Sequence, residues 1–204
     1  MKREEKNQQT RRRILDSALT EFSKHGYGAS SVNAICAVQN ISKGIIYHYF
    51  DTKDDLFLAC VEECFTLLTD YLKDTVQFRS GEIQNQLEVY FTARNNFFVK
   101  HPVYQRIFCE AIFSPPAHLK MEIQRQKQNF DLLNTKILEC ILDQISLRPQ
   151  ITKHDVIETF RQFQDFINAK YQFSDLSAQE FETHEENCRK ALDILLYGVI
   201  KKGE

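Results

Sequence analysis

The 204-residue sequence is poor in helix breakers and has no long apolar stretch. It holds only 6 Gly and 4 Pro, and no Gly/Pro-rich or low-complexity segment divides it. No run of about 18 apolar residues could span a bilayer, and the charged first residues lack the apolar stretch of a secretion signal. These features predict a globular, helix-rich protein of the cytoplasm, with no membrane segment.

The six cysteines show no CxxC or zinc-finger spacing. A chain of this length can bury a core without disulfides or metal, so we expect no metal site and no cofactor. Cys60 and Cys64 lie one turn apart on a predicted helix, which leaves a redox role open, although buried structural thiols are commoner. No Ser/His/Asp order, Gly-rich phosphate loop, HExxH or paired-carboxylate motif stands out, which predicts that the protein is not an enzyme.

Charge is divided unevenly along the chain, although the net charge is only -2. Residues 1–53 hold nine Lys and Arg against five Asp and Glu, whereas the other 151 residues hold seventeen against twenty-three. A basic N-terminal part on an acidic remainder is the distribution expected when only the N-terminal part meets phosphates.

Start and stop signals near the N-terminus predict three helices. The first covers about 8–25 and stops at Gly26, the second covers 32–39 behind Ser31, and the third covers 43–49 behind Ser42. Ser is a favoured N-cap residue, and Asn40 tolerates the left-handed backbone of a tight turn between the second and third helices. Two short helices joined by such a turn and packed on a longer one form a helix-turn-helix.

Further helices are predicted to the end of the chain. They cover about 53–76, 83–101, 103–113, a stretch carrying Ile123 to Ile145, 153–171 and 178–202. Three of them begin with a capping-box pattern, at Thr52 with Asp55, Thr152 with Asp155, and Ser177 with Glu180. No convincing period-two apolar run occurs, so the predicted fold is all-α, without a sheet.

Residues 30–57, SSVNAICAVQNISKGIIYHYFDTKDDLF, resemble the signature of the TetR family of transcriptional regulators. In that signature, T-x-x-x-I-A-x-x-A-G-V precedes S-K-G-T-L-Y-x-H/Y-F and then x-x-K-E-x-L. The defining positions that match include Gly44, Tyr47, Phe50, Lys53 and Leu56. The departures are Asn40 for the usual Gly, Gln39 for the common Ala and Ile45 for the common Thr.

The resemblance implies a DNA-binding helix-turn-helix domain over 1–53 and a helical effector-binding and dimerisation domain over 54–204. In the first domain, residues 43–49 would enter the major groove, where Gly44 permits close approach and Ile45 suits a thymine methyl. Lys53, at a helix N-terminus, would hold a phosphate. The expected DNA-binding residues are Asn33, Lys43, Gly44, Ile45, Tyr47, His48, Tyr49 and Lys53. The run Arg11 to Arg13 could reach flanking phosphates or lie over the helix surface.

A small recognition helix needs a second copy to bind tightly, so we expect a homodimer on a palindromic operator. The apolar faces of the last two helices, with Phe163 and Phe166 among them, are the expected interface, as the resemblance also implies. The aromatic-rich second domain suits a small apolar or aromatic effector, although each ring taken singly is more often core. The expected effector-binding residues are Phe65, Tyr90, Phe91, Arg94, Phe98, Tyr104, Phe108 and Phe130.

The function predicted from these features is a transcriptional regulator, a repressor by the resemblance, that its effector releases from DNA. A helical enzyme, or an adaptor that keeps the fold without binding DNA, is the alternative.

Overall fold

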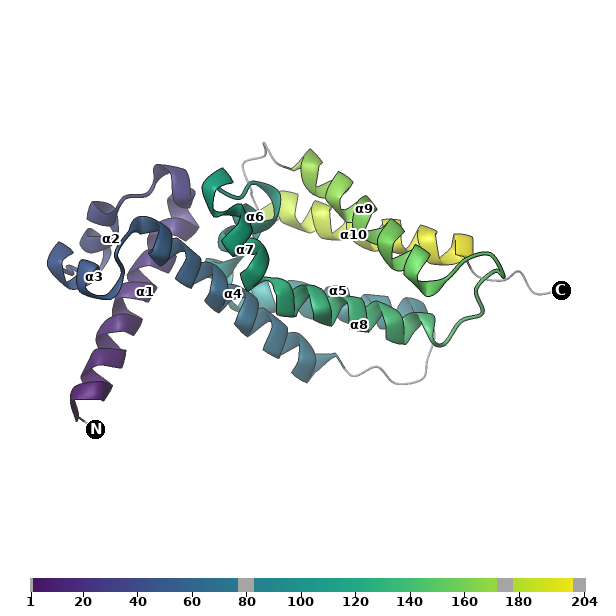
Figure 1. Ribbon diagram of the computed structural model, residues 1–204, viewed down its shortest axis with the longest axis horizontal. Coiled ribbons are helices and arrows are strands. Elements are labelled where there is room, and N and C mark those ends of the chain that lie inside the picture. Colours follow the sequence, from purple (N-terminus) through teal and green to yellow (C-terminus); the bar gives the residue numbers. More distant parts are fainter. Residues whose placement is uncertain (1, 77–82, 172–177, 200–204) are drawn as a thin grey trace. The chain divides into compact units, whose positions relative to one another are not determined.

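The computed structural model describes residues 2–76, 83–171 and 178–199, and these residues are almost entirely helical (Figure 1). The all-α prediction is confirmed, because no β-strand occurs in these ranges. None of the helices in these ranges has the length and hydropathy required to cross a membrane. The elements are α1 (Lys2–Ala29), α2 (Val32–Val38), α3 (Lys43–Tyr49), α4 (Lys53–Thr75), α5 (Ile83–Lys100), α6 (Pro102–Phe113), η1 (Ala117–Leu119), α7 (Lys120–Gln126), α8 (Gln128–Leu142), α9 (Lys153–Lys170) and α10 (Ala178–Val199).

Two helices differ from their predicted extents. Helix α1 begins at Lys2 rather than near residue 8, and Gly26, with φ 73°, interrupts it one turn before its end. The single helix predicted through Ile123 and beyond is instead divided into η1, α7 and α8, with the break at Lys127. The seven-residue spacing from Ile123 to Phe130 equals two helical turns, so the apolar pattern continues across the break and hides it.

The capping boxes form where the sequence predicts them. At the start of α4, the Thr52 N–H donates to Asp55 Oδ2 over 2.9 Å, and the Asp55 N–H donates to Thr52 Oγ1 over 3.1 Å. Thr152 and Asp155 make the same reciprocal pair at the start of α9. The third predicted box, at Ser177, lies outside the described residues. Each box satisfies N–H groups that have no partner within the first turn of a helix.

The chain divides into two compact units. The first comprises Met1–Thr66 and His101–Lys127, and the second comprises Leu67–Lys100 and Gln128–Glu204. In the first unit, α1 packs against α2 and α6. Fully buried aromatic and aliphatic side chains from four of its helices form the core, among them Phe22, Ile35, Ile46 and Phe57. The compact unit that contains the helix-turn-helix therefore also includes α6 and α7, and the predicted functional boundary at residue 53 stays a prediction.

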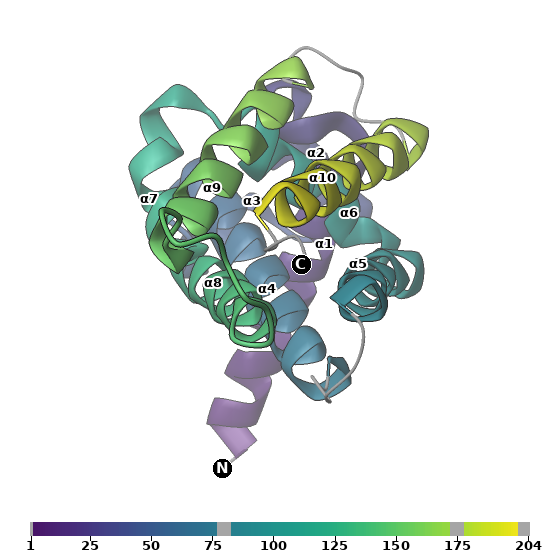
Figure 2. The same cartoon turned by 90° about the vertical axis from the view of Figure 1, so that its right-hand side faces the viewer.

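The second unit is a helical bundle. Helix α10 packs against both α9 and α5, and α8 packs against α9 (Figure 2). Its core contains Phe97, Ile141, Leu142, Phe181 and Leu196, all at most 2% exposed. Packing of these faces, rather than intrinsic helix propensity, supplies most of the stability of such helices.

The turn between α2 and α3 depends on the left-handed backbone of Asn40, whose φ is 51°. We expect Asn40→Val to lower the free energy of unfolding by about 1–2 kcal/mol, because a β-branched side chain crowds the backbone in this conformation. Asn40→Gly is the matched control and should change stability by less than about 0.5 kcal/mol. Urea unfolding followed by circular dichroism measures both, and equal stability of the two variants would show that the turn does not require this conformation.

Candidate nucleic-acid interface

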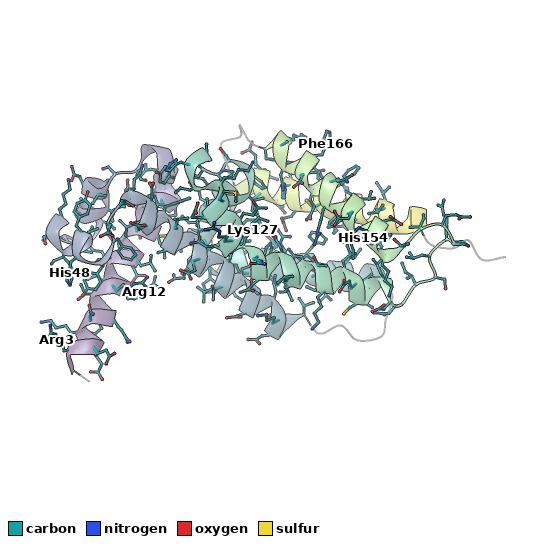
Figure 3. All side chains as sticks on the ribbon, in the orientation of Figure 1. Arg3, Arg12, His48, Lys127, His154 and Phe166 are labelled. Atoms are coloured by element: carbon teal, nitrogen blue, oxygen red, sulfur yellow. The ribbon has the colours of Figure 1, made fainter. Side chains whose placement is uncertain are left out.

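Helix α3 is fixed to the core by one side and exposed on the other. Ile46 is its one fully buried residue and packs in the core of the first unit. Lys43, Gly44, Ile45, Tyr47 and His48 are exposed, and Tyr49 is half-buried. Ile45 and Tyr47, which flank the buried Ile46 in the sequence, are 43% and 42% exposed. Such a face is a candidate binding surface, and the labelled His48 marks it in Figure 3.

Gly44 is not required by the packing of the protein itself. A Cβ built on it would have no atom within 4 Å, and its φ does not lie in the left-handed region. Gly within a helix destabilises it by about 0.5–1 kcal/mol relative to Ala. The residue therefore costs stability without relieving an internal clash, as expected if the room is needed for an external partner.

The entry to α3 is formed by backbone hydrogen bonds. The Ile41 N–H donates to Cys36 O over 2.9 Å across the turn, and the Ile45 and Ile46 N–H groups donate to Ser42 O. Ser42 occupies the N-cap position, but its side chain makes no capping hydrogen bond, so that detail of the prediction is wrong. Because Ser42 is exposed, water can satisfy the first-turn N–H groups in its place.

Helix α2 carries the exposed Asn33 beside the turn. Ser31 caps this helix as predicted, because its Oγ accepts the Ala34 N–H over 3.1 Å. Inside, the Ser17 hydroxyl donates to Ile35 O over 2.6 Å and ties α2 to α1. Asn33 is thus held on a braced helix, with its amide free to face a partner.

Lys53 contacts the protein more closely than its sequence position suggests. Its Nζ donates to Tyr27 O over 2.9 Å and to Ser30 O over 3.2 Å, and it lies 4.0 Å from the centroid of the Tyr27 ring. The ammonium group has three donors, so two of them close the end of α1 and one is left. Lys53 is half-buried, and the predicted phosphate contact would use the remaining donor.

The run Arg11 to Arg13 mainly supports the fold. Arg12 forms ion pairs with Asp16 and Glu63, and Arg13 Nη2 donates to Gln39 O over 2.6 Å. The Arg11 guanidinium lies 5.2 Å from the centroid of the Phe50 ring. These contacts hold α1 against the neighbouring elements, and contact of the run with flanking phosphates stays a prediction.

A cluster centred on Tyr27 links α1, α4 and α6 within the first unit, and no sequence pattern pointed to it. The Tyr27 N–H donates to both carboxylate oxygens of Glu110 over 3.0 Å, and its hydroxyl donates to Asp54 Oδ1 over 2.5 Å. His118 Nε2 lies 3.0 Å from the other Asp54 oxygen. Burial, with the hydrogen bond to Asp54, raises the pKa of Tyr27 to about 12. Burial also raises the pKa of Glu110.

Three of the predicted effector-binding residues lie in the first unit. Phe65 on α4 and Phe108 on α6 are buried against each other, with ring centroids 5.7 Å apart. The Tyr104 hydroxyl donates to Glu63, the residue that also binds Arg12. These side chains brace α4 and α6.

The other five, Tyr90, Phe91, Arg94, Phe98 and Phe130, lie in the second unit. Arg94 is buried, binds Glu185 Oε1 over 2.9 Å and donates to the Tyr90 hydroxyl over 3.2 Å. Tyr90 and Phe91 border a small cavity of about 30 Å³ with a mostly apolar lining. The Arg94 guanidinium lies 5.6 Å from the centroid of the Phe130 ring on α8. Phe98 packs elsewhere, against Phe181 of α10, with ring centroids 5.0 Å apart.

Burial determines the state of the two cysteines on α4. Cys60 and Cys64 are both 0% exposed, and burial raises the pKa of each thiol well above its usual value. Because the thiolate is the reactive form, this environment is that of a structural cysteine.

Residues 14–60 match the family model of bacterial regulatory proteins of the tetR family, and this stretch contains the exposed α3 and its supporting helices. This stretch thus carries the N-terminal DNA-binding domain typical of the TetR family. Over 60 residues it is 35% identical to the negative transcriptional regulator IcaR of the biofilm operon icaADBC of Staphylococcus epidermidis, a match that covers 29% of this chain and 32% of IcaR. It is 24% identical to IcaR of Staphylococcus aureus (strain Newman) over 176 residues, 86% of this chain and 89% of the relative.

Solved structures resemble this chain over more than nine tenths of its length. The regulator FadR of Bacillus subtilis, in complex with stearoyl-CoA, has a TM-score of 0.67 at 15% identity, covering 92% of this chain and 98% of FadR. SmeT, repressor of the Stenotrophomonas maltophilia multidrug efflux pump SmeDEF, has a TM-score of 0.66 at 17% identity, covering 95% of this chain and 91% of SmeT. At these identities, the resemblance concerns the fold.

Proposed function

We propose that this TetR-family protein is a repressor that binds a palindromic operator as a homodimer and leaves it when a small effector binds. The observation that carries the proposal is the face of α3, where Gly44, Ile45 and Tyr47 are exposed on a helix that Ile46 fixes to the core. The name of the IcaR relatives, a negative transcriptional regulator, supports repression. A bacterial operator lies in the cytoplasm, where the protein would act.

In this proposal the exposed residues divide into base-reading and phosphate-binding groups. Lys43 reaches a guanine edge or a phosphate, Ile45 packs on a thymine methyl, and Gly44 lets the backbone approach the groove. Tyr47, His48 and Tyr49 contact phosphates or base edges, and Asn33 reaches the same groove from α2. Lys53 contributes affinity through its remaining donor.

The homodimer would form through α9 and α10. Phe163 and Phe166 on α9 are 50% and 75% exposed, with ring centroids 6.3 Å apart, and Ile194 on α10 is 71% exposed. Figure 3 shows the labelled Phe166 on the outer side of α9. Two such helices from each of two copies form a four-helix bundle, which buries these side chains. Ile167 on α9 and Leu192 on α10 are buried within one copy, so they would not contribute to the interface.

Effector release would act through α6. Helix α6 packs on α1, and Glu110 holds the Tyr27 amide at the end of α1. A shift of α6 would therefore alter the support of the helix-turn-helix, and coupling of this kind is reciprocal: DNA weakens effector binding by the same factor. The stearoyl-CoA complex of FadR supports the idea of an effector with an apolar part.

Salt dependence tests whether the protein binds DNA through phosphates. We expect Lys53→Ala to lower the slope of log affinity against log salt by about one unit, because one phosphate contact is lost. Fluorescence anisotropy on a selected genomic fragment measures the slope. Lys136→Ala, exposed on α8, is the control and should leave it unchanged.

Because Lys53→Ala also removes two hydrogen bonds to the end of α1, its thermal melting curve must be recorded alongside. A folded Lys53→Ala protein with an unchanged slope would remove Lys53 from the interface. A wild-type protein whose binding does not respond to salt would favour the adaptor alternative.

A further inference from the structure

A polar groove lies between α5 and α10 in the second unit, with a volume of about 650 Å³. Its lining includes four carboxylates, two cationic side chains and one aromatic ring. The carboxylates are Glu88, Glu182, Glu185 and Glu186, and the cations are Arg189 and Lys190. The volume is far larger than a bare ion requires and is within the range of small-molecule sites.

The carboxylates of the groove are not equally neutralised. Both cations bind Glu186, at 2.8 Å from Arg189 and 3.4 Å from Lys190, and these contacts lower the pKa of Glu186 to about 2. Glu88 and Glu182 are exposed and make no ion pair among the described residues. After internal pairing, the groove therefore retains an excess of negative charge.

Glu185 is the decisive side chain. It is 6% exposed, and its Oε1 accepts a hydrogen bond from Arg94 over 2.9 Å and lies 3.3 Å from His184 Nδ1. Its second oxygen, Oε2, is buried and has no hydrogen-bond partner in the part of the chain that the structure describes. A buried carboxylate oxygen without a donor is uncommon, because buried polar atoms are nearly always satisfied.

We infer that this groove binds a small organic cation of the primary-amine class, whose ammonium group pairs with the Glu185 carboxylate and reaches Oε2 when the side chain turns toward the groove. The excess of carboxylates favours a cation over a neutral donor such as an alcohol. Phe91 borders both the groove and the small apolar cavity lined by Leu87 and Ile141. An amine with an alkyl tail would place its head in the groove and its tail against Phe91. Its role as an effector rests on the proposed function, whereas its binding does not.

Calorimetric titration of the full chain with three probes of equal chain length tests the inference. We expect octylamine to bind at least tenfold more tightly than octanol, and octanoate to bind more weakly still. Equal affinity for the amine and the alcohol would overturn the assignment of a cation.

Substitutions in the groove test where the amine binds. Glu185→Gln should weaken octylamine binding at least tenfold, and the double variant Glu88→Gln/Glu182→Gln, which alters only exposed side chains, should weaken it about fivefold. Glu139→Gln, exposed on α8, is the matched control and should bind octylamine as the wild type does. If Glu185→Gln does not fold, the double variant still tests the inference. Undiminished octylamine binding by the double variant would contradict the claim that the excess negative charge of the groove attracts a cation.

Operator release is measured separately, by anisotropy of a bound DNA fragment. Octylamine that binds without releasing DNA would contradict its role as effector and leave the site standing. A protein that binds no operator would contradict the proposed function, while the titration would still report on the groove.

Discussion

Gly44→Ala is expected to weaken operator binding about 30-fold while making the free protein more stable. The Cβ meets no atom of the protein within 4 Å, so the fold accepts it, and Ala in a helix is favoured over Gly by about 0.5–1 kcal/mol. In the complex, the same methyl group would stand between the recognition helix and the groove. Loss of one close base contact costs about 2 kcal/mol, which corresponds to the 30-fold change.

Because Gly44→Ala should weaken DNA binding but stabilise the free protein, a loss of binding cannot be attributed to a damaged fold. Gly28→Ala is a suitable control, because a Cβ there also meets nothing within 4 Å but lies outside α3. Anisotropy titration gives the DNA affinity, and thermal unfolding gives the stability. If Gly44→Ala binds operator as tightly as the wild type, the close approach of α3 to DNA is wrong.

Arg94→Met should be the most destabilising single change, lowering the free energy of unfolding by about 3–5 kcal/mol. Arg94 and Glu185 are 4% and 6% exposed, and their ion pair is 2.9 Å long. Removing the guanidinium leaves the buried Glu185 carboxylate with only His184 Nδ1, 3.3 Å from Oε1, beside it. Loss of the buried Arg94 charge is far costlier than removal of an exposed pair.

The double variant Arg94→Met/Glu185→Leu is the control. Because neither buried charge remains, it should recover most of the lost stability, as measured by chemical unfolding at pH 7. Arg161→Met breaks an exposed pair with Glu158 and should change stability by less than about 1 kcal/mol. A small effect of Arg94→Met would show that Glu185 finds another donor, and would weaken the case for the amine site.

Local signals in the sequence were sufficient to predict α2, α3 and the start of α4. Ser31, Asn40 and Thr52 each take the conformation or capping role that their chemistry favours, and α3 has its predicted extent. The family resemblance marked α3 as the DNA-reading helix, and the alternation of Ile46 with exposed neighbours is consistent with that role. The individual DNA contacts stay predictions.

Contacts between distant segments could not be predicted in this way. The Tyr27 cluster joins residues 27, 54, 110 and 118, and the Arg94 pair joins residues 91 positions apart. No periodicity in the sequence predicts such contacts, because they depend on how the helices pack. For the same reason, aromatic content alone could not separate Phe65 and Phe108, which brace the first unit, from Tyr90 and Phe91 beside the cavity.

Selection of genomic DNA fragments by the purified protein, followed by footprinting, tests the central claim most directly. We predict a palindromic site with two protected major-groove segments, centred about 34 Å or a multiple of that distance apart, as two α3 helices of a dimer require. The Gly44→Ala protein should protect neither segment at the same concentration. Recovery of no specific fragment, or of a single protected segment that survives the substitution, would contradict the account.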